Sequence, residues 1–213
     1  MVIYPSIISS DLLNIEKEIE SLEPYVEGFH IDVMDFHFVQ NLTLGPDFVN
    51  KIRKITKKKL FVHLMVENPS KFIDLLNLQE QDIISFHIEV EEKLEDVIKQ
   101  IHEKKLFASL AIKPKTELET VIPYGRKIDH LLLMTVEPGF SGQKFLPESL
   151  ERIKLLKSLM DINQFSFPIG VDGGINKDNI KELSKLGIHD AAAATAIFKS
   201  EDRIKALKEL QNL

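Results

Sequence analysis

The chain has 213 residues, 44% of them hydrophobic, which is enough to bury a sizeable core. Its 27 Lys and Arg residues against 33 Asp and Glu residues give a formal charge of −6, which argues against binding to nucleic acid or to anionic membranes. Because the sequence contains no cysteine, disulfides, cysteine metal sites and thiol nucleophiles are excluded.

Two kinds of segment alternate along the whole chain. Short apolar runs rich in β-branched residues predict strands, and amphipathic stretches rich in Lys and Glu predict helices. The predicted strands cover residues 2–4, 29–34, 60–65, 82–87, 106–112, 130–135, 167–172 and 190–194. The predicted helices cover residues 11–22, 46–57, 70–78, 91–104, 116–122, 147–160, 177–186 and 201–210. This order is typical of βα units that build a parallel sheet.

The number and spacing of these units predict the architecture. Eight units in 213 residues average about 27 residues each, which is compact for a (β/α)8 TIM barrel but within its usual range. No linker or low-complexity segment interrupts the series, so we expect a single domain over residues 1–213. A doubly wound open sheet alternates in the same way and is the structural alternative.

The amino terminus carries no targeting signal that we recognise. Residues 1–6 contain no basic segment ahead of an apolar one, and Asp11 interrupts the hydrophobicity early, so we expect a cytoplasmic protein. No apolar run approaches the roughly 18 residues that a bilayer span requires, and no membrane association is expected.

Polar residues on otherwise apolar strands are the first candidates for chemistry. Side chains alternate along a strand, so His30, Asp32 and Met34 share one face of their predicted strand. His63 lies on the same face as Met65 in the next strand. If the apolar faces pack on helices, these polar groups point into the barrel, where an unpaired charge is costly.

A second carboxylate, Asp172, ends the seventh predicted strand directly before Gly173. With His30, Asp32 and His63 it makes a set of two imidazoles and two carboxylates, which suits a divalent transition metal. Taken alone, each histidine is also explained as a core residue and Asp172 as the cap of a turn. The metal interpretation depends on all four lying at strand ends that a barrel brings together.

Glycine is scarce, yet several glycines gather after the sixth and seventh predicted strands. They are Gly139, Gly142, Gly173 and Gly174. Glycine loops present backbone N–H groups to anions, so they indicate a phosphate site, although turns that need positive φ explain glycines as well. There is no Walker A loop and no G-x-G-x-x-G motif, and Ser141 is not in a nucleophile elbow with a base partner.

Six segments resemble motifs of one known family. They are PSIISSD at 5–11, HIDVMD at 30–35 with HFV and Asn41 after it, HLMV at 63–66, SFHIE at 85–89, MTVEPGF at 134–140 and VDGGI at 171–175. On these motifs the chain resembles the ribulose-phosphate 3-epimerase family over essentially its whole length. The resemblance implies a ribulose-phosphate-binding type of TIM barrel and a homo-oligomer.

The resemblance also implies roles for individual residues. The metal ligands of the family correspond to His30, Asp32, His63 and Asp172, holding one divalent ion per chain, which would be Zn, Fe, Mn or Co. Asp32 and Asp172 would be the acid/base pair that inverts C3 of a ketose phosphate through a cis-enediolate. The substrate would contact Ser6 and His63, and the family's site-lining methionines correspond to Met34, Met65 and Met134, which core filling explains equally well.

The implied phosphate loops lie at Gly139, Gly142, Gly173–Gly174 and Ala194–Thr195. At several positions near them the chain departs from the family pattern. Phe36 and Ser141 replace glycines, Gln40 replaces a proline, Gly170 replaces a polar residue, and Ala194–Thr195 replaces Gly-Ser. If position 194 required positive φ, its alanine would be strained.

Four functions are compatible with these features. The first is interconversion of D-ribulose 5-phosphate and D-xylulose 5-phosphate, and the second is the same epimerisation of a six-carbon substrate such as D-allulose 6-phosphate. The third is a barrel that binds a phosphorylated sugar without catalysis, against which the complete His and Asp set argues. The fourth is a decarboxylase or lyase, which would need a catalytic lysine near a strand end.

Overall fold

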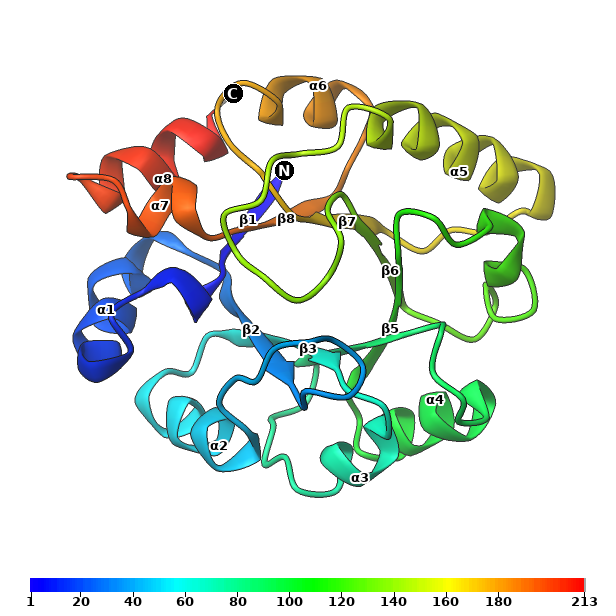
Figure 1. Ribbon diagram of the computed structural model, residues 1–213, viewed down its shortest axis with the longest axis horizontal. Coiled ribbons are helices and arrows are strands. Elements are labelled where there is room, and N and C mark those ends of the chain that lie inside the picture. The colour runs from blue at the N-terminus through cyan, green and yellow to red at the C-terminus, as the bar shows by residue number, and fades with distance from the viewer. Residues whose placement is uncertain (213) are drawn as a thin grey trace.

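Eight parallel strands form the centre of the protein, and helices surround them (Figure 1). The structure is a computed structural model and describes residues 1–212. The strands are β1 (Val2–Pro5), β2 (Gly28–Met34), β3 (Lys59–Met65), β4 (Ile83–His87), β5 (Phe107–Ile112), β6 (His130–Met134), β7 (Ile169–Asp172) and β8 (Asp190–Ala193). Neighbours are hydrogen-bonded in the order β1-β8-β7-β6-β5-β4-β3-β2. A parallel bridge between Ser6 and His30 joins β1 to β2, so the barrel closes and the doubly wound sheet is wrong.

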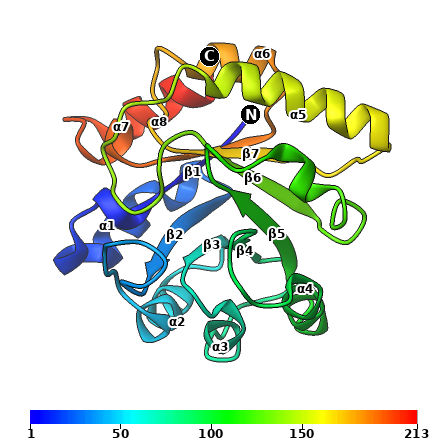
Figure 2. The same ribbon diagram turned by 45° about the vertical axis from the view of Figure 1, so that its right-hand side comes forward.

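The helices lie outside the barrel in both ribbon views (Figure 1, Figure 2). The α-helices are α1 (Ile15–Leu22), α2 (Pro46–Ile55), α3 (Pro69–Ile73), α4 (Leu94–Glu103), α5 (Ser149–Asn163), α6 (Ile180–Lys185), α7 (Thr195–Phe198) and α8 (Arg203–Gln211). The 3₁₀ helices are η1 (Ile7–Ser9), η2 (Leu12–Asn14), η3 (Glu23–Tyr25) and η4 (Leu118–Val121). Within residues 1–212, no helix combines the length and the apolar character that crossing a bilayer requires.

Four helical segments differ from the sequence-based prediction. The helix expected at 70–78 is shorter, since α3 ends at Ile73. The helix expected at 11–22 is divided, because the Asp11 side chain accepts a hydrogen bond from the Leu13 amide and starts η2 before α1. The helix expected at 116–122 is only the 3₁₀ turn η4, since Pro123 follows at once and cannot continue an α-helix. The four residues of α7 are too few for hydrophobic periodicity to reveal them.

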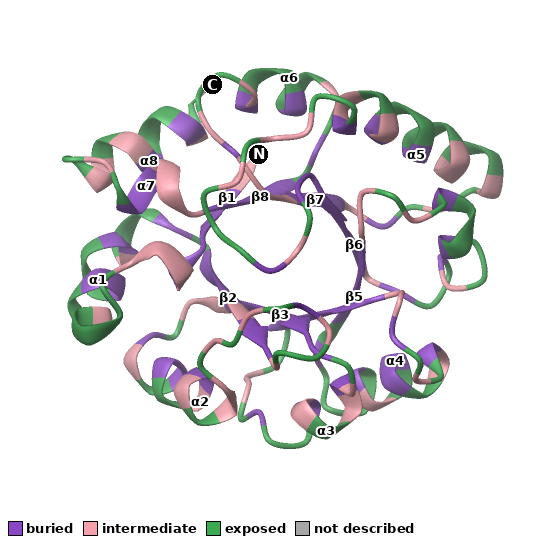
Figure 3. Cartoon of the chain, in the orientation of Figure 1, coloured by how far each residue is buried: buried purple, intermediate pink, exposed green. Residues whose placement is uncertain are grey.

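The strands separate two buried regions. Their outward side chains, including Ile31 and Val62, pack with the helices in the main hydrophobic core. A smaller cluster inside the barrel contains Phe61, Leu132 and Met134. Figure 3 shows the buried residues along the strands and on the inner faces of the helices. The interior of the barrel also holds polar side chains, among them His30, His63 and His130.

The predicted alternation along β2 and β3 is confirmed. Ile31 and Val33 belong to the outer core, whereas Met34 packs with Met65 in a separate cluster. On the inward face below these methionines, His30 and His63 are both completely buried. Two neighbouring strands therefore present a histidine each to the barrel interior.

A second polar cluster fills the amino-terminal end of the barrel interior. Asp190 Oδ2 lies 3.1 Å from His130 Nε2 and 2.9 Å from His189 Nδ1, and Ser109 Oγ lies 2.8 Å from His130 Nδ1. Gly170 faces this cluster, because a Cβ atom there would lie 2.3 Å from Asp190 Oδ1. The space that a larger side chain would take at position 170 is thus occupied by the Asp190–His130 pair, which explains this departure from the family pattern.

Replacing this glycine should over-pack the barrel. We expect Gly170→Ala to lower the free energy of unfolding by about 1–3 kcal/mol, measured by chemical denaturation. Gly45 is the control, because a Cβ atom there meets nothing within 4 Å. Gly45→Ala should cost less than about 1 kcal/mol, the loss of a glycine at the start of a helix. Equal stability of the two variants would contradict the close packing at Gly170.

Candidate metal and substrate site

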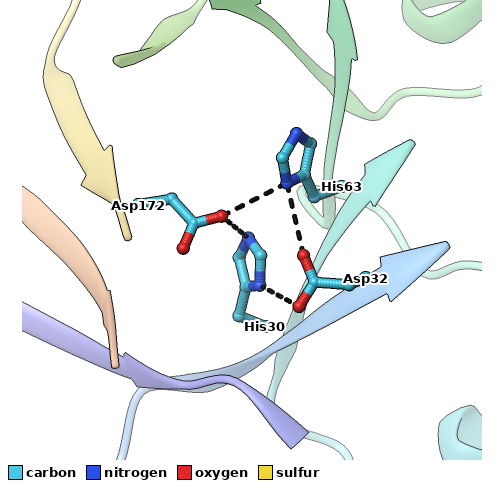
Figure 4. Close-up of side chains that lie close together, drawn as sticks. All are labelled: His30, Asp32, His63 and Asp172. Carbon is cyan, nitrogen blue, oxygen red and sulfur yellow. Dashed lines mark ion pairs between the residues drawn. The ribbon is translucent and has the colours of Figure 1, made fainter. Parts of the chain in front are cut away.

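The four side chains predicted as a metal-ligand set lie together at one end of the barrel (Figure 4). His30 and Asp32 come from β2, His63 from β3, and Asp172 from the last residue of β7. One nitrogen or oxygen atom of each residue lies within 4.8 Å of the corresponding atoms of the other three. The expectation that the barrel brings these residues together is confirmed, but only Asp172 ends a strand, whereas His30, Asp32 and His63 lie within β2 and β3.

Each histidine lies between the two carboxylates. His63 Nδ1 is 3.4 Å from Asp32 Oδ1 and 3.3 Å from Asp172 Oδ2. His30 Nδ1 is 3.4 Å from Asp32 Oδ2, and its Nε2 is 3.9 Å from Asp172 Oδ2. Both imidazoles are fully buried, whereas the Asp32 and Asp172 side chains are 7% and 17% exposed. The carboxylates therefore form the accessible surface of the cluster.

The donor set fits a divalent metal ion. His30 Nδ1 and Nε2 and His63 Nδ1 are buried without a hydrogen-bond partner among the described residues. Buried polar atoms are normally satisfied, so unpaired ring nitrogens that face two carboxylates indicate a missing electrophilic partner. Two nitrogen and two oxygen donors match the preferences of a transition metal that retains open positions for a substrate.

The electrostatics of the cluster also favour a cation. Burial by itself raises the pKa of Asp32, but the rings of His30 and His63 outweigh burial and hold this pKa well below its usual range. Burial lowers the pKa of His63, but Asp172 and Asp32 raise it by a larger amount, so the pKa is about 9. The two carboxylates thus favour a positive charge at this position.

Hydroxyl groups fix the two aspartates in place. Ser6 Oγ donates to Asp32 Oδ2 at 2.7 Å, as its predicted location near the site requires. Thr43 Oγ1 donates to the Asp32 backbone carbonyl at 2.8 Å, and Thr135 Oγ1 lies 2.9 Å from the Asp172 backbone carbonyl and 2.6 Å from that of Gly173. Neither threonine carries a sequence signal for this role, because its partner lies 11 or 37 positions away along the chain.

A cavity lies above the two carboxylates, and both of them line it. The other predicted site residues that line the same cavity are Ser6, Met34, Met65, Met134, Gly139, Gly142, Gly173, Gly174, Ala194 and Thr195. The three methionines are 2–3% exposed, so they fill the core and face the cavity at the same time. His30 and His63 are not part of the lining, because they lie fully buried.

The loops after β6, β7 and β8 meet on one side of this cavity. A Cβ atom at Gly142 would lie 3.6 Å from Thr195 Cγ2. Gly173 and Gly174 have φ values of +120° and +68°, and a side chain at 173 would collide with Val136. None of the described lining residues is Lys or Arg. An anion on this side would therefore depend on backbone N–H groups and hydroxyls.

Ala194 is accommodated without the strain that a left-handed conformation would impose. Its φ is −104°, which lies outside the region that favours glycine. Position 194 therefore does not require positive φ, and its alanine does not carry that strain.

The loop after β2 contacts Gly139 in the loop after β6, which lines the cavity. Asn41 Nδ2 donates to the Gly139 carbonyl at 2.6 Å, and Val39 packs against the same glycine. Phe36 adopts a φ of +66° in this loop, a conformation that costs a side-chain-bearing residue about 1 kcal/mol or more. Phe36 thus adopts the left-handed conformation that a glycine would adopt at this position. Gln40, in the same loop, is exposed.

A buried histidine, His87, and a half-buried glutamate, Glu89, lie behind His63. His63 Nε2 lies 2.9 Å from His87 Nε2, and His87 Nδ1 lies 3.1 Å from Glu89 Oε2. Burial lowers the pKa of His87 to about 4, so its ring is neutral near pH 7. Both residues belong to the SFHIE motif at 85–89, from which the sequence alone predicts no role for either. The available signal was the alternation along β4, which directs His87 to the barrel interior.

The fold and the cluster together define a class of protein, a (β/α)8 barrel with a candidate cation site and an anion-suited cavity at the carboxyl ends of its strands. Comparison with known families then identifies the chain more closely. The model of the ribulose-phosphate 3 epimerase family matches residues 2–198, and the chain belongs to this family.

Individual relatives are similar over almost the entire chain. A ribulose-phosphate 3-epimerase of Helicobacter pylori is 38% identical over 100% of this chain and 98% of its own length. The enzymes of that name from Schizosaccharomyces pombe and Bacillus subtilis are each 36% identical, covering 99% and 98% of this chain and 92% and 97% of their own lengths.

Solved structures resemble the barrel at much lower sequence identity. A 3-hexulose-6-phosphate synthase has a TM-score of 0.71 at 15% identity, covering 100% of this chain and 99% of its own. KGPDC from Streptococcus mutans in complex with D-R5P has a TM-score of 0.72 at 12% identity, covering 99% and 95%. These structures support the fold alone.

Proposed function

We propose that the protein is a metal-dependent epimerase that interconverts D-ribulose 5-phosphate and D-xylulose 5-phosphate. The observation that carries this proposal is the pair Asp32 and Asp172, which face one cavity and belong to one cluster with two unpaired imidazoles. Curated relatives named ribulose-phosphate 3-epimerase, at 36–38% identity over nearly the full chain, support the choice of reaction.

Inversion at C3 requires two proton-transfer groups. A proton α to a carbonyl must leave from one face of the carbon, and a proton must return to the other face. Ser6 holds the Asp32 carboxylate, while Thr43 and Thr135 contact the backbone carbonyls of Asp32 and Asp172 and so hold the two strand segments that carry the carboxylates. In this proposal one aspartate serves each face of C3, and their roles exchange with the direction of the reaction.

The residues that would hold the metal are His30, Asp32, His63 and Asp172. When bound, a divalent ion supplies Lewis-acid chemistry that favours the charged enediolate form of the substrate. His30 and His63 are buried and contribute only positioned nitrogen atoms. Asp32 and Asp172 are partly accessible, so they can combine a ligand role with proton transfer.

The substrate is proposed to lie between the methionines and the glycine loops. Met34, Met65 and Met134 give the cavity an apolar wall that limits access of water to the reacting carbon. The phosphate would lie against Gly142, Gly173–Gly174 and Ala194–Thr195, where backbone N–H groups provide donors independent of side-chain identity. Gly139 would hold the mouth of the cavity through its carbonyl, which accepts from Asn41.

Solvent exchange tests the reaction and the substrate together. Metal-loaded protein in deuterated water should incorporate deuterium at C3 of D-ribulose 5-phosphate and form D-xylulose 5-phosphate, followed by NMR. The same measurement with D-allulose 6-phosphate should give slower conversion. Conversion of the six-carbon sugar alone would contradict the proposed substrate, and absence of exchange with either sugar would contradict catalysis.

The metal site is tested by stoichiometry. We expect elemental analysis after reconstitution and desalting to give one divalent ion per chain, and much less than one for His63→Ala. His102→Ala is the control, because this histidine lies on the protein surface. Unchanged metal content in His63→Ala would contradict the assignment of His63 as a metal ligand.

Each aspartate should be required for epimerisation. Asp32→Asn and Asp172→Asn should each lower kcat about 10²- to 10⁴-fold, which is the usual contribution of a general acid or base. Asp178→Asn is the control, since Asp178 is exposed on the surface after β7 and does not line the cavity. Metal content is measured on the same samples. Normal turnover in either variant with metal bound would contradict the two-base assignment.

We also propose that copies of the chain form a homo-oligomer, which exposed apolar side chains near the cavity mouth support. Leu12, Leu13 and Leu42 are 40%, 95% and 67% exposed, and Leu12 and Leu42 line one surface groove. Light scattering during size-exclusion chromatography should give a mass that is a multiple of 24.4 kDa. A single species at the mass of one chain would contradict the proposal. The cytoplasmic location stays a prediction.

A further inference from the structure

A line of three side chains runs from the metal-ligand cluster to the outside of the barrel. It begins at His63, whose Nδ1 faces the two aspartates. His63 Nε2 lies 2.9 Å from His87 Nε2, and His87 Nδ1 lies 3.1 Å from Glu89 Oε2. Both rings are fully buried, so water does not compete for these contacts.

The geometry permits one arrangement of protons that suits a metal at His63 Nδ1. A metal ligand must present a lone pair, so the single proton of a neutral His63 then lies on Nε2. His87 Nε2 must accept that proton's hydrogen bond, which places the proton of His87 on Nδ1. Glu89 accepts from His87 Nδ1 and completes the line. Each donor therefore meets an acceptor only in this tautomeric state.

Glu89 is held so that it remains an acceptor. Its Oε1 accepts from the Lys113 backbone amide at 2.8 Å and from Thr116 Oγ1 at 2.6 Å, while Oε2 faces His87. The two contacts of Oε1 require an oxygen without a proton. Burial alone raises the pKa of Glu89, but these hydrogen bonds outweigh burial and lower it. The loop after β5 thus fixes the far end of the line.

Aromatic packing fixes the ring of His87. The centroids of the His87 and His63 rings are 5.0 Å apart, and the Phe38 ring lies 4.7 Å from the His87 ring. Lys113 Nζ lies 3.9 Å above the Phe38 ring, on the same loop whose amide holds Glu89. His87 therefore has little freedom to rotate away from His63.

We propose that His87 and Glu89 are positioning residues for the metal ligand His63, which orient its ring and hold its proton on Nε2 so that Nδ1 is free to bind the ion. This inference rests on the proposed metal site. A histidine ligand whose second nitrogen donates to a fixed acceptor binds its metal more tightly, and loss of such a partner typically lowers affinity about 10- to 100-fold.

The test compares two substitutions of His87 by metal affinity rather than by activity. Chelator competition measures the affinity of the full chain for Zn²⁺, and the visible spectrum of the Co²⁺-loaded protein reports the ligand environment. His87→Phe keeps a buried ring but removes the acceptor, and should weaken Zn²⁺ binding about 10- to 100-fold with an altered Co²⁺ spectrum. His87→Gln restores a carbonyl acceptor and should recover most of the affinity.

Glu89→Gln tests the outer end of the line independently. The glutamine side chain has one oxygen that accepts and one N–H₂ group that donates. It therefore either loses the hydrogen bond from the Lys113 backbone amide or turns its N–H₂ group towards His87 Nδ1. In the second orientation the proton of His87 lies on Nε2, where it faces the Nε2 proton of His63, and the hydrogen bond between the two rings is lost. We expect weaker Zn²⁺ binding, with little change in the melting temperature of the metal-free protein. His102→Phe is the matched control at an exposed histidine and should bind Zn²⁺ like the wild type.

The outcomes separate this inference from the proposed function. If wild type and His63→Ala bind Zn²⁺ equally, the metal site itself is wrong. If His63→Ala loses binding while His87→Phe and Glu89→Gln match the wild type, the site stands and the positioning role is overturned. Equal loss in His87→Phe and His87→Gln would also overturn it, because a purely structural role gives no rescue by an acceptor.

Discussion

The structure is organised around the placement of two carboxylates and two imidazoles in one buried space. Such groups are costly in a low-dielectric interior unless a counter-charge joins them. Here the four residues come from three strands, and they meet only because the barrel closes. Closure, core packing and the chemistry of the site thus depend on one arrangement of β2, β3 and β7.

The rest of the barrel interior is consistent with this constraint. Phe61 separates the metal-ligand cluster from the second polar cluster, with ring centroids 5.1 Å from His30 and 5.2 Å from His130. Asp190 pairs with His130 at the opposite end, and the absence of a side chain at Gly170 makes room for that pair. Two buried polar clusters therefore share one barrel without contact between their charged groups.

Much of this architecture could be predicted from the sequence, because it depends on local periodicity. Alternation by two along each strand directs His30, Asp32 and His63 to the interior, and the series of βα units predicts the barrel. The pairing of Asp190 with His130 could not be predicted in this way, since it joins residues 60 positions apart. The left-handed Phe36 was equally hidden, because its conformation is imposed by the loop contacts and contradicts the residue's preference.

We propose that these four side chains together hold one divalent ion. Crystals of the protein soaked or grown with Co²⁺, with diffraction recorded on both sides of the metal absorption edge, test it most directly. We expect one anomalous peak per chain, in contact with His30, Asp32, His63 and Asp172. A strong peak at other residues, or an empty cluster in crystals that hold the metal elsewhere, would contradict it.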